Sequence, residues 1–183
     1  MDEVKRTTMA VLVDNEAGVL SQISRLFSRK GYNIESLAVG ATDDPRVSRI
    51  TIEVLADGDH AALLSNQLRK LFPVHSVKIL TPEKSIRREL ILLKVRAETG
   101  EKRNEVIQIA NIFRASIIDV STGSLTLALI GDEQKTAALQ AILEQSELLE
   151  LVRTGIVALE RGVETINEDT KEKGEFNLGK NFM

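Results

Sequence analysis

The sequence predicts an α+β fold built from two similar βαββαβ units in tandem. Three observations support this: short β-branched and apolar runs alternate with amphipathic helical stretches, the same order recurs after roughly 80 residues, and a short polar segment around Pro82 separates the copies. A βαββαβ unit is the ferredoxin-like arrangement, in which an antiparallel sheet carries both helices on one face. We therefore expect two related domains rather than a solenoid.

The first unit is delimited by clear turn residues. Gly31 ends the first helical stripe, and Pro73 ends the second, because neither residue continues a helix well. The elements expected here, in order, are a strand at 7–13, a helix at 19–27, strands at 33–42 and 48–56, a helix at 61–72 and a strand at 74–80.

The second unit repeats this order after a linker. The elements expected here are a strand at 89–97, a helix at 106–113, strands at 116–120 and 125–130, a helix at 137–143 and a closing strand within 148–159. The predicted domain limits are 1–80 for the first domain, 81–84 for the linker, 85–162 for the second domain and 163–183 for a polar C-terminal tail. That tail is either a frayed end or a partner-binding segment anchored by Phe176, Leu178 and Phe182.

Composition excludes several function classes. The chain has 24 Lys and Arg against 27 Asp and Glu, and its basic residues are scattered along the sequence, so no nucleic-acid partner is expected. Apolar runs of about five residues are far below the ~20 that span a bilayer, so no membrane partner is expected. There is no cysteine, and the two histidines, His60 and His75, are interpreted as a helix-start surface residue and a strand residue. No metal is expected, because cysteine is absent and two histidines are too few for a His-rich site, and no cofactor is expected, because aromatic residues that could stack on one make up only 3% of the chain.

Each predicted domain is small. About 80 residues bury a limited core, and an open sheet face or edge strand is usually covered by a second copy. We expect a homodimer or higher homo-oligomer whose sheets or helices meet across a symmetry axis.

The loop between the first strand and the first helix carries the most chemical information. Unpaired N–H groups at a helix start favour a carboxylate, and Gly18 allows close approach because it has no Cβ. The side chain of Asn15 offers a donor and an acceptor, which suits a zwitterion. The alternative is that Asp14 or Asn15 simply caps the helix.

The longer segment DNEAGVLSQISRLFSRKGYNIESLAV, residues 14–39, resembles the ACT domain, a ferredoxin-like module that binds amino acids. Within that group the chain resembles the regulatory (small) subunit of acetohydroxyacid synthase, also called acetolactate synthase, over roughly residues 7–162. The combination of GYNIES with TDDP at 42–45 is the specific part of this likeness. Further matching segments are REL at 88–90, LKV at 93–95, FRA at 113–115, IIDV at 117–120, TGIV at 154–157 and LERG at 159–162.

The resemblance implies regulation rather than catalysis, so the chain is expected not to be an enzyme. In this family a separate large subunit holds thiamine diphosphate, Mg²⁺ and FAD and makes acetolactate or acetohydroxybutyrate. The small subunit activates it and makes it sensitive to a branched-chain amino acid, usually valine. A cytoplasmic location is expected, because the N-terminus lacks an apolar signal segment. The alternatives are an ACT regulator of another metabolic enzyme or of transcription, and a free-standing enzyme on the same scaffold.

The family's effector site lies at the interface of an ACT dimer. Carried over by position, its residues are Asn15, Gly18, Val19, Leu20, Asn33 and Ile34. Ser21 lies one turn into the helix, where its hydroxyl either bonds back to the chain or approaches the ligand. The alternative for Asn33 is a turn hydrogen bond, and for Glu35 a solvent-facing position or a basic partner.

The second domain departs from the first at the corresponding loop, residues 98–104, which lacks the Asn-x-x-Gly arrangement. We expect it to keep the scaffold without the effector site and to be a candidate face for the catalytic subunit. Arg87 and Arg88 are either a partner contact or the solvated end of the linker.

Overall fold

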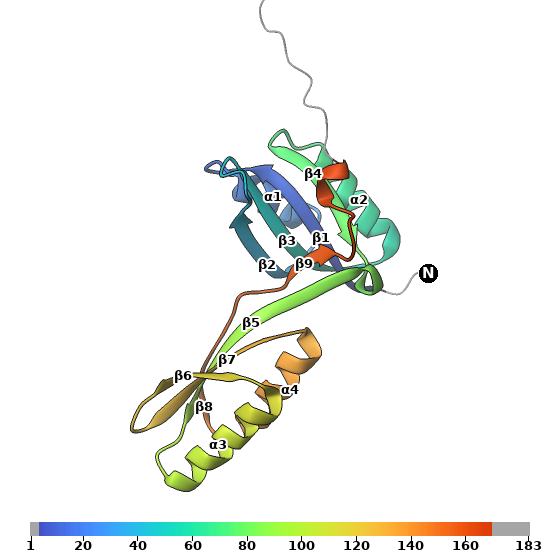
Figure 1. Ribbon diagram of the computed structural model, residues 1–183. Helices are drawn as coiled ribbons and strands as arrows, with labels where there is room; N and C mark the ends of the chain where they lie inside the picture. The colour runs from blue at the N-terminus through green and yellow to red at the C-terminus, as the bar shows by residue number, and fades with distance from the viewer. Residues whose placement is uncertain (1–3, 170–183) are drawn as a thin grey trace, which may run out of the picture.

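The computed structural model describes residues 4–169, and both predicted units are present (Figure 1). The first unit consists of β1 (Lys5–Asp14), α1 (Val19–Arg29), β2 (Ile34–Ala41), β3 (Val47–Ala56), α2 (Gly58–Arg69) and β4 (Val74–Leu80). The second consists of β5 (Ser85–Arg96), α3 (Gly100–Phe113), β6 (Ser116–Val120), β7 (Ser124–Gly131), α4 (Glu133–Glu144) and β8 (Leu148–Arg153). The α+β prediction of two tandem ferredoxin-like units is confirmed.

The first sheet has the order β2-β3-β1-β4, with every neighbouring pair antiparallel. Alternate β1 residues such as Met9 and Val11 point to the face covered by α1 and α2, where Ile23 and Phe27 complete the core. Gly31, with φ +75°, closes α1, and the N–H of Tyr32 donates to the carbonyl of Phe27 at 3.0 Å. This glycine turn sets the direction in which β2 leaves the helix.

The second sheet has the order β6-β7-β5-β8 and carries α3 and α4 on one face. Its core is apolar, with Leu93, Leu127 and Leu139 fully buried. The two domains therefore have separate cores of the same design.

A long strand and a returning segment join the domains. The predicted linker is a single 3-10 turn, η1 (Pro82–Lys84), and β5 starts at once and runs for 12 residues. The single strand expected within 148–159 is in fact two strands, β8 and β9 (Val157–Glu160), because the chain turns at Gly155, whose φ is +79°. β9 pairs with the first four residues of β5.

The returning segment packs on the first domain, although its residues fall within the limits predicted for the second domain and, from 163 onward, for the polar tail. It forms a third core on the sheet face opposite the helices, made of Ala10, Leu12, Leu80, Ile156, Ala158 and Ile166, the last from η2 (Ile166–Asp169). That face of the first sheet is thus covered by the chain itself, whereas its outer strand β2 is an edge.

Two smaller expectations need correction. Phe72 is 82% exposed, because α2 ends at Arg69 and the turn before Pro73 carries Phe72 off the buried face. Arg87 is neither a free linker end nor a free partner contact, since its guanidinium pairs with the buried carboxylate of Glu53. Arg88 is exposed.

Within residues 4–169, no helix is both long enough and apolar enough to cross a bilayer. The tail residues Phe176, Leu178 and Phe182 lie outside the described residues.

Candidate functional site

Two residues once considered as helix caps instead anchor the loop between β1 and α1. The backbone N–H of Asn15 donates to the carbonyl of Arg46 at 2.7 Å, and its Nδ2 donates to the carbonyl of Pro45 at 2.9 Å. An oxygen of Asp14 lies 2.6 Å from Nε2 of His75. Neither side chain reaches the helix start, so the capping alternative is wrong.

The start of α1 is left without a side-chain cap. Gly18 stands at the cap position with φ +88°, and the first turn contains no acidic residue. Within residues 4–169, the backbone N–H groups of Leu20 and Ser21 have no acceptor. In contrast, α2, α3 and α4 are capped by the side chains of Asp57, Thr99 and Asp132. The free donors and the positive end of the helix dipole suit an anionic group.

The space above this helix start is open. Apart from Gly18 itself and its two neighbours in the chain, no atom of the described residues lies within 4 Å of the position that a Cβ on Gly18 would occupy. Val19 is buried in the core, so only its backbone is available, whereas Leu20 is 42% exposed. Ser21 is exposed, and its hydroxyl makes no hydrogen bond to the part of the chain that the structure describes. The back-bonding alternative for Ser21 is therefore not seen.

The loop that supports Asn15 is itself held by an ion pair. The carboxylate of Asp44 accepts from the backbone N–H, Nε and Nη2 of Arg46 at 2.8–3.0 Å. These hydrogen bonds to Arg46 lower the pKa of Asp44 to about 2. The sequence analysis identified the TDDP motif but did not predict a role for Arg46, the next residue. The opposite charges of Asp44 and Arg46, two residues apart, were the signal that could have indicated this ion pair.

Asn33 and Ile34 lie at the other end of the sheet. The side chain of Asn33 is exposed and donates from Nδ2 to Oε1 of Glu35 at 2.8 Å, so Asn33 makes a side-chain bond rather than the turn bond considered as its alternative. Ile34 is half-buried against the first core and opposite Val54. The structure thus gathers Asn15, Gly18, Leu20 and Ser21 at one end of the sheet, and does not bring Asn33 to them within one chain.

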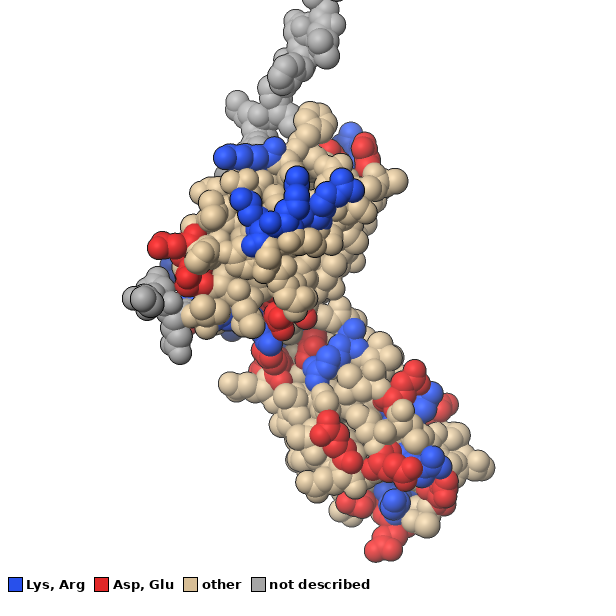
Figure 2. Space-filling model, turned by 180° about the vertical axis from the view of Figure 1, so that it is seen from behind, with Lys and Arg blue, Asp and Glu red and all other residues tan. Residues whose placement is uncertain are grey.

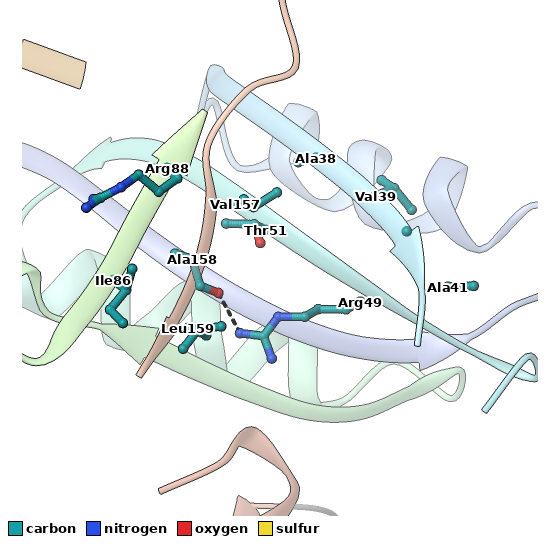
Figure 3. Close-up of a pocket in the computed structure, with 11 residues that line it drawn as sticks. Ala38, Val39, Ala41, Arg49, Thr51, Ile86, Arg88, Val157, Ala158 and Leu159 are labelled. Atoms are coloured by element: carbon teal, nitrogen blue, oxygen red, sulfur yellow. Dashed lines mark hydrogen bonds between the residues drawn. The ribbon is translucent and has the colours of Figure 1, made fainter. Parts of the chain in front are cut away.

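An apolar hollow of about 450 Å³ lies beside the edge strand rather than over the helix start (Figure 3). It separates β2, which contributes Ala38 and Val39, from Val157 and Leu159 of β9. Arg49 crosses its floor and donates from Nη2 to the carbonyl of Ala158 at 2.7 Å. Burial lowers the pKa of Arg49.

The second domain differs at the corresponding helix start, as expected from the missing Asn-x-x-Gly arrangement. Residues 98–104 are only partly loop, because α3 already begins at Gly100. The hydroxyl of Thr99 caps it by accepting from the N–H of Lys102 at 3.3 Å. Among residues 4–169 there is no cluster of three His, Asp or Glu side chains arranged to hold a metal ion.

Two ferredoxin-like units, one with an open and uncapped helix start beside a free sheet edge, define a tandem-domain protein of the ACT type. A family profile described as the small-subunit-like ACT domain of acetohydroxyacid synthase matches residues 9–76, and one described as the small subunit of acetolactate synthase matches residues 88–162. The chain belongs to the acetolactate synthase small-subunit family.

Similar proteins agree with this assignment. The acetolactate synthase small subunit of Haemophilus influenzae is 43% identical over 162 residues, which cover 88% of this chain and 99% of that protein. That of Mycobacterium leprae is 46% identical over 155 residues, or 85% of this chain and 91% of that protein. The crystal structure of the acetolactate synthase small subunit from Thermotoga maritima matches with a TM-score of 0.82 at 35% identity, covering 88% of this chain and all of the other.

Proposed function

We propose that the chain is the non-catalytic regulatory subunit of acetolactate synthase, which activates a separate catalytic subunit and confers feedback inhibition by a branched-chain amino acid, with valine the first candidate. The single observation that supports an amino-acid effector best is the start of α1. Among the α-helices in the described part of the chain, α1 alone begins without a side-chain cap, and its start faces open space.

The effector's carboxylate would lie at this helix start. The N–H groups of Leu20 and Ser21 are free to donate to it, and Gly18 leaves room for close approach. The hydroxyl of Ser21 is a further free donor. The carbonyl oxygen of Asn33 or the carboxylate of Glu35, which now holds the Asn33 amide, would accept from the effector's ammonium group.

The site would be shared between two copies. β1 and β2 are not neighbours but both pair antiparallel with β3, so they run in the same direction. The loop that follows β1 and Asn33, which precedes β2, therefore lie at opposite ends of the sheet. If two β2 edge strands pair antiparallel about a two-fold axis, Asn33 of one copy comes beside Gly18 of the other. Such pairing also covers the free edge of the sheet.

Selection among branched-chain amino acids would depend on apolar contacts. Leu20 is 42% exposed at the helix start, and Ile34 is half-buried next to Asn33. One methylene in such a pocket changes binding by about 1–3 kcal/mol, so these two side chains would set the preference for valine over its relatives.

The signal would leave the site along β2. Ser36, two residues after Ile34, accepts a hydrogen bond from the N–H of Ile156 at 2.9 Å, which ties β2 to the segment leading to the second domain. A change at a β2 interface would thus reach the second domain directly. Coupling between an effector and a partner is typically about 1–3 kcal/mol.

The catalytic partner would be the large subunit that carries thiamine diphosphate, Mg²⁺ and FAD in this family, and the complex would work in the cytoplasm. The purified chain should make no acetolactate alone, should raise the rate of its cognate large subunit, and should make that rate sensitive to valine. A mixture that gains rate but ignores all three branched-chain amino acids would favour the alternative of an unrelated effector. A mixture that gains no rate would overturn the proposal.

A further inference from the structure

Cationic side chains gather on the helix face of the first domain (Figure 2). The exposed outer surface of α1 carries Arg25, Arg29 and Lys30, and α2 ends beside exposed Lys70. The sequence of α1 contains no acidic residue. These residues are scattered along the sequence, but they share the helix face of the first domain, because α1 and α2 pack side by side on it. We call these four residues the basic face.

The cations of the basic face are unpaired. Within residues 4–169, none of the four forms an ion pair or a side-chain hydrogen bond. Elsewhere, arginines such as Arg87 and Arg153 pair with the buried carboxylates of Glu53 and Glu89. Unbalanced like charges repel one another, and a solvated surface usually intersperses both signs.

The second domain shows that ordinary pattern. Its helix α3 mixes Glu101 and Glu105 with Lys102 and Arg103, and Figure 2 shows red and blue side by side over this domain. The helix dipole explains a preference for Arg29 and Lys30 at the end of α1. It does not explain Arg25 one turn earlier, where a like charge four residues from Arg29 destabilises the helix.

We propose that the basic face docks an acidic surface of the catalytic subunit. This inference rests on the proposed function, which supplies a protein partner, and it adds the surface of this chain that meets that partner. Charges on a docking face act mainly on association rate and on salt dependence.

A protein fits the basic face better than a nucleic acid does. α1 is about 16 Å long, so the basic face is short, and Figure 2 shows acidic side chains on the second domain that would repel the phosphates of a nucleic acid lying across both domains. The chain as a whole carries a net charge of −3 and has one tyrosine and no tryptophan for stacking on bases.

The placement of the basic face gives α1 two roles. The effector loop with Gly18 opens the helix, and Arg25 and Arg29 lie about two and three turns later on the same rigid element. A small tilt of α1 on effector binding would therefore move the docking cations, in addition to the change that β2 would carry to the second domain.

The test uses the full chain and its cognate catalytic subunit. The double variant Arg25→Glu with Arg29→Glu is compared with Lys5→Glu with Lys84→Glu, which makes the same change in net charge at two exposed lysines outside the basic face and outside the second domain. Activation is titrated at about 50 and 300 mM salt. Calorimetric valine binding and thermal melting check that each variant is folded with its effector loop intact.

We expect the half-saturating concentration of the first variant to rise by about tenfold or more at low salt, with a weaker salt dependence than wild type, while the control stays within about twofold of wild type. Equal titrations for both variants would overturn the inference and leave the proposed function standing. Failure of the wild-type chain to activate would overturn the proposed function itself and this inference with it. Tight binding of a labelled DNA or RNA duplex, abolished by the first variant alone, would assign the face to nucleic acid and contradict it as well.

Discussion

Asn15 and Asn33 lie at opposite ends of the first sheet. Asp14, before Asn15, pairs with Val47 at one end of β3, whereas Ile34, after Asn33, pairs with Val54 near the other. Seven residues of extended strand separate these positions, or about 23 Å at ~3.3 Å per residue. If both asparagines bind one effector, they must come from two chains.

Gly18→Asp should abolish amino-acid inhibition of the reconstituted complex and leave activation near wild type. The new carboxylate would occupy the open space at the helix start and repel the effector's own carboxylate. Gly162→Asp is the control, because Gly162 also has positive φ and no atom near its Cβ position, so both variants carry about 1–2 kcal/mol of left-handed strain. Equal loss of inhibition in both would attribute the effect to strain rather than to the ligand.

Gly155→Ala should uncouple the domains. Its Cβ would lie 2.8 Å from Oγ of Ser36 and 3.1 Å from the carbonyl of Leu37, at a residue whose φ is +79°. We expect a loss of about 2 kcal/mol or more in the free energy of unfolding, and weaker inhibition although valine still binds. Gly162→Ala introduces the same left-handed backbone strain without a steric clash, so it should lower the free energy of unfolding by less. If valine inhibited the Gly155→Ala complex as strongly as the wild-type complex, the contact between Ser36 and Gly155 would not carry the effector signal to the second domain.

A chain that ends at residue 80 should not form a stable domain. It lacks Ile156 and Ile166, and it uncovers Leu12 and Leu80 on the sheet face opposite the helices. Since each buried Leu or Ile contributes about 1.5–3 kcal/mol, the loss is a large part of a typical 5–15 kcal/mol stability. Circular-dichroism melts of residues 1–80 and 1–169 should differ by well over 10 °C. Matching melts would mean that the third core contributes little.

The ion pair of Asp44 predicts a pH dependence. Because the hydrogen bonds to Arg46 lower the pKa of Asp44 from its ordinary value of 3.8 to about 2, its contribution to stability is complete above pH 3.8 and is lost as the pH falls through 2. An NMR titration of the Asp44 carboxyl should show this low pKa, and Arg46→Ala should return it toward 3.8. A wild-type pKa near 3.8 would mean that the pair does not hold the loop in solution.

Much of the fold follows from local pattern. β4 and β6 have the predicted limits, because Pro73 and Ser116 mark their starts and each strand is a short β-branched run. β9 and the third core could not be predicted, since pairing of Arg88 with Val157 joins residues far apart in the chain. The prediction that Phe72 lies on the buried face of a helix was wrong for a local reason, because α2 ends at Arg69.

The candidate site was predictable in part. Gly18, singled out because it lacks a Cβ, has a positive φ of 88°, a backbone conformation that favours glycine, whereas its contact with an effector stays a prediction. The true partners of Asn15, the carbonyls of Pro45 and Arg46, belong to a loop 30 residues further along the chain. The separation of Asn15 from Asn33 depends on strand direction, which becomes definite only once the sheet order is known.

Mixing two defective chains tests the shared site most directly. Asn15→Ala and Asn33→Ala homodimers should each activate the catalytic subunit but resist valine. In a mixed dimer one site receives both substitutions, and the other combines the intact Asn15 of one chain with the intact Asn33 of its partner. Unfolding and refolding the two variants together, with each variant refolded alone as the control, should therefore restore valine binding to about one site in four, since half of randomly paired dimers are mixed and each has one intact site. Calorimetry that finds no valine binding in the co-refolded sample, with mixed dimers demonstrated by differential tagging, would contradict a site built from two chains.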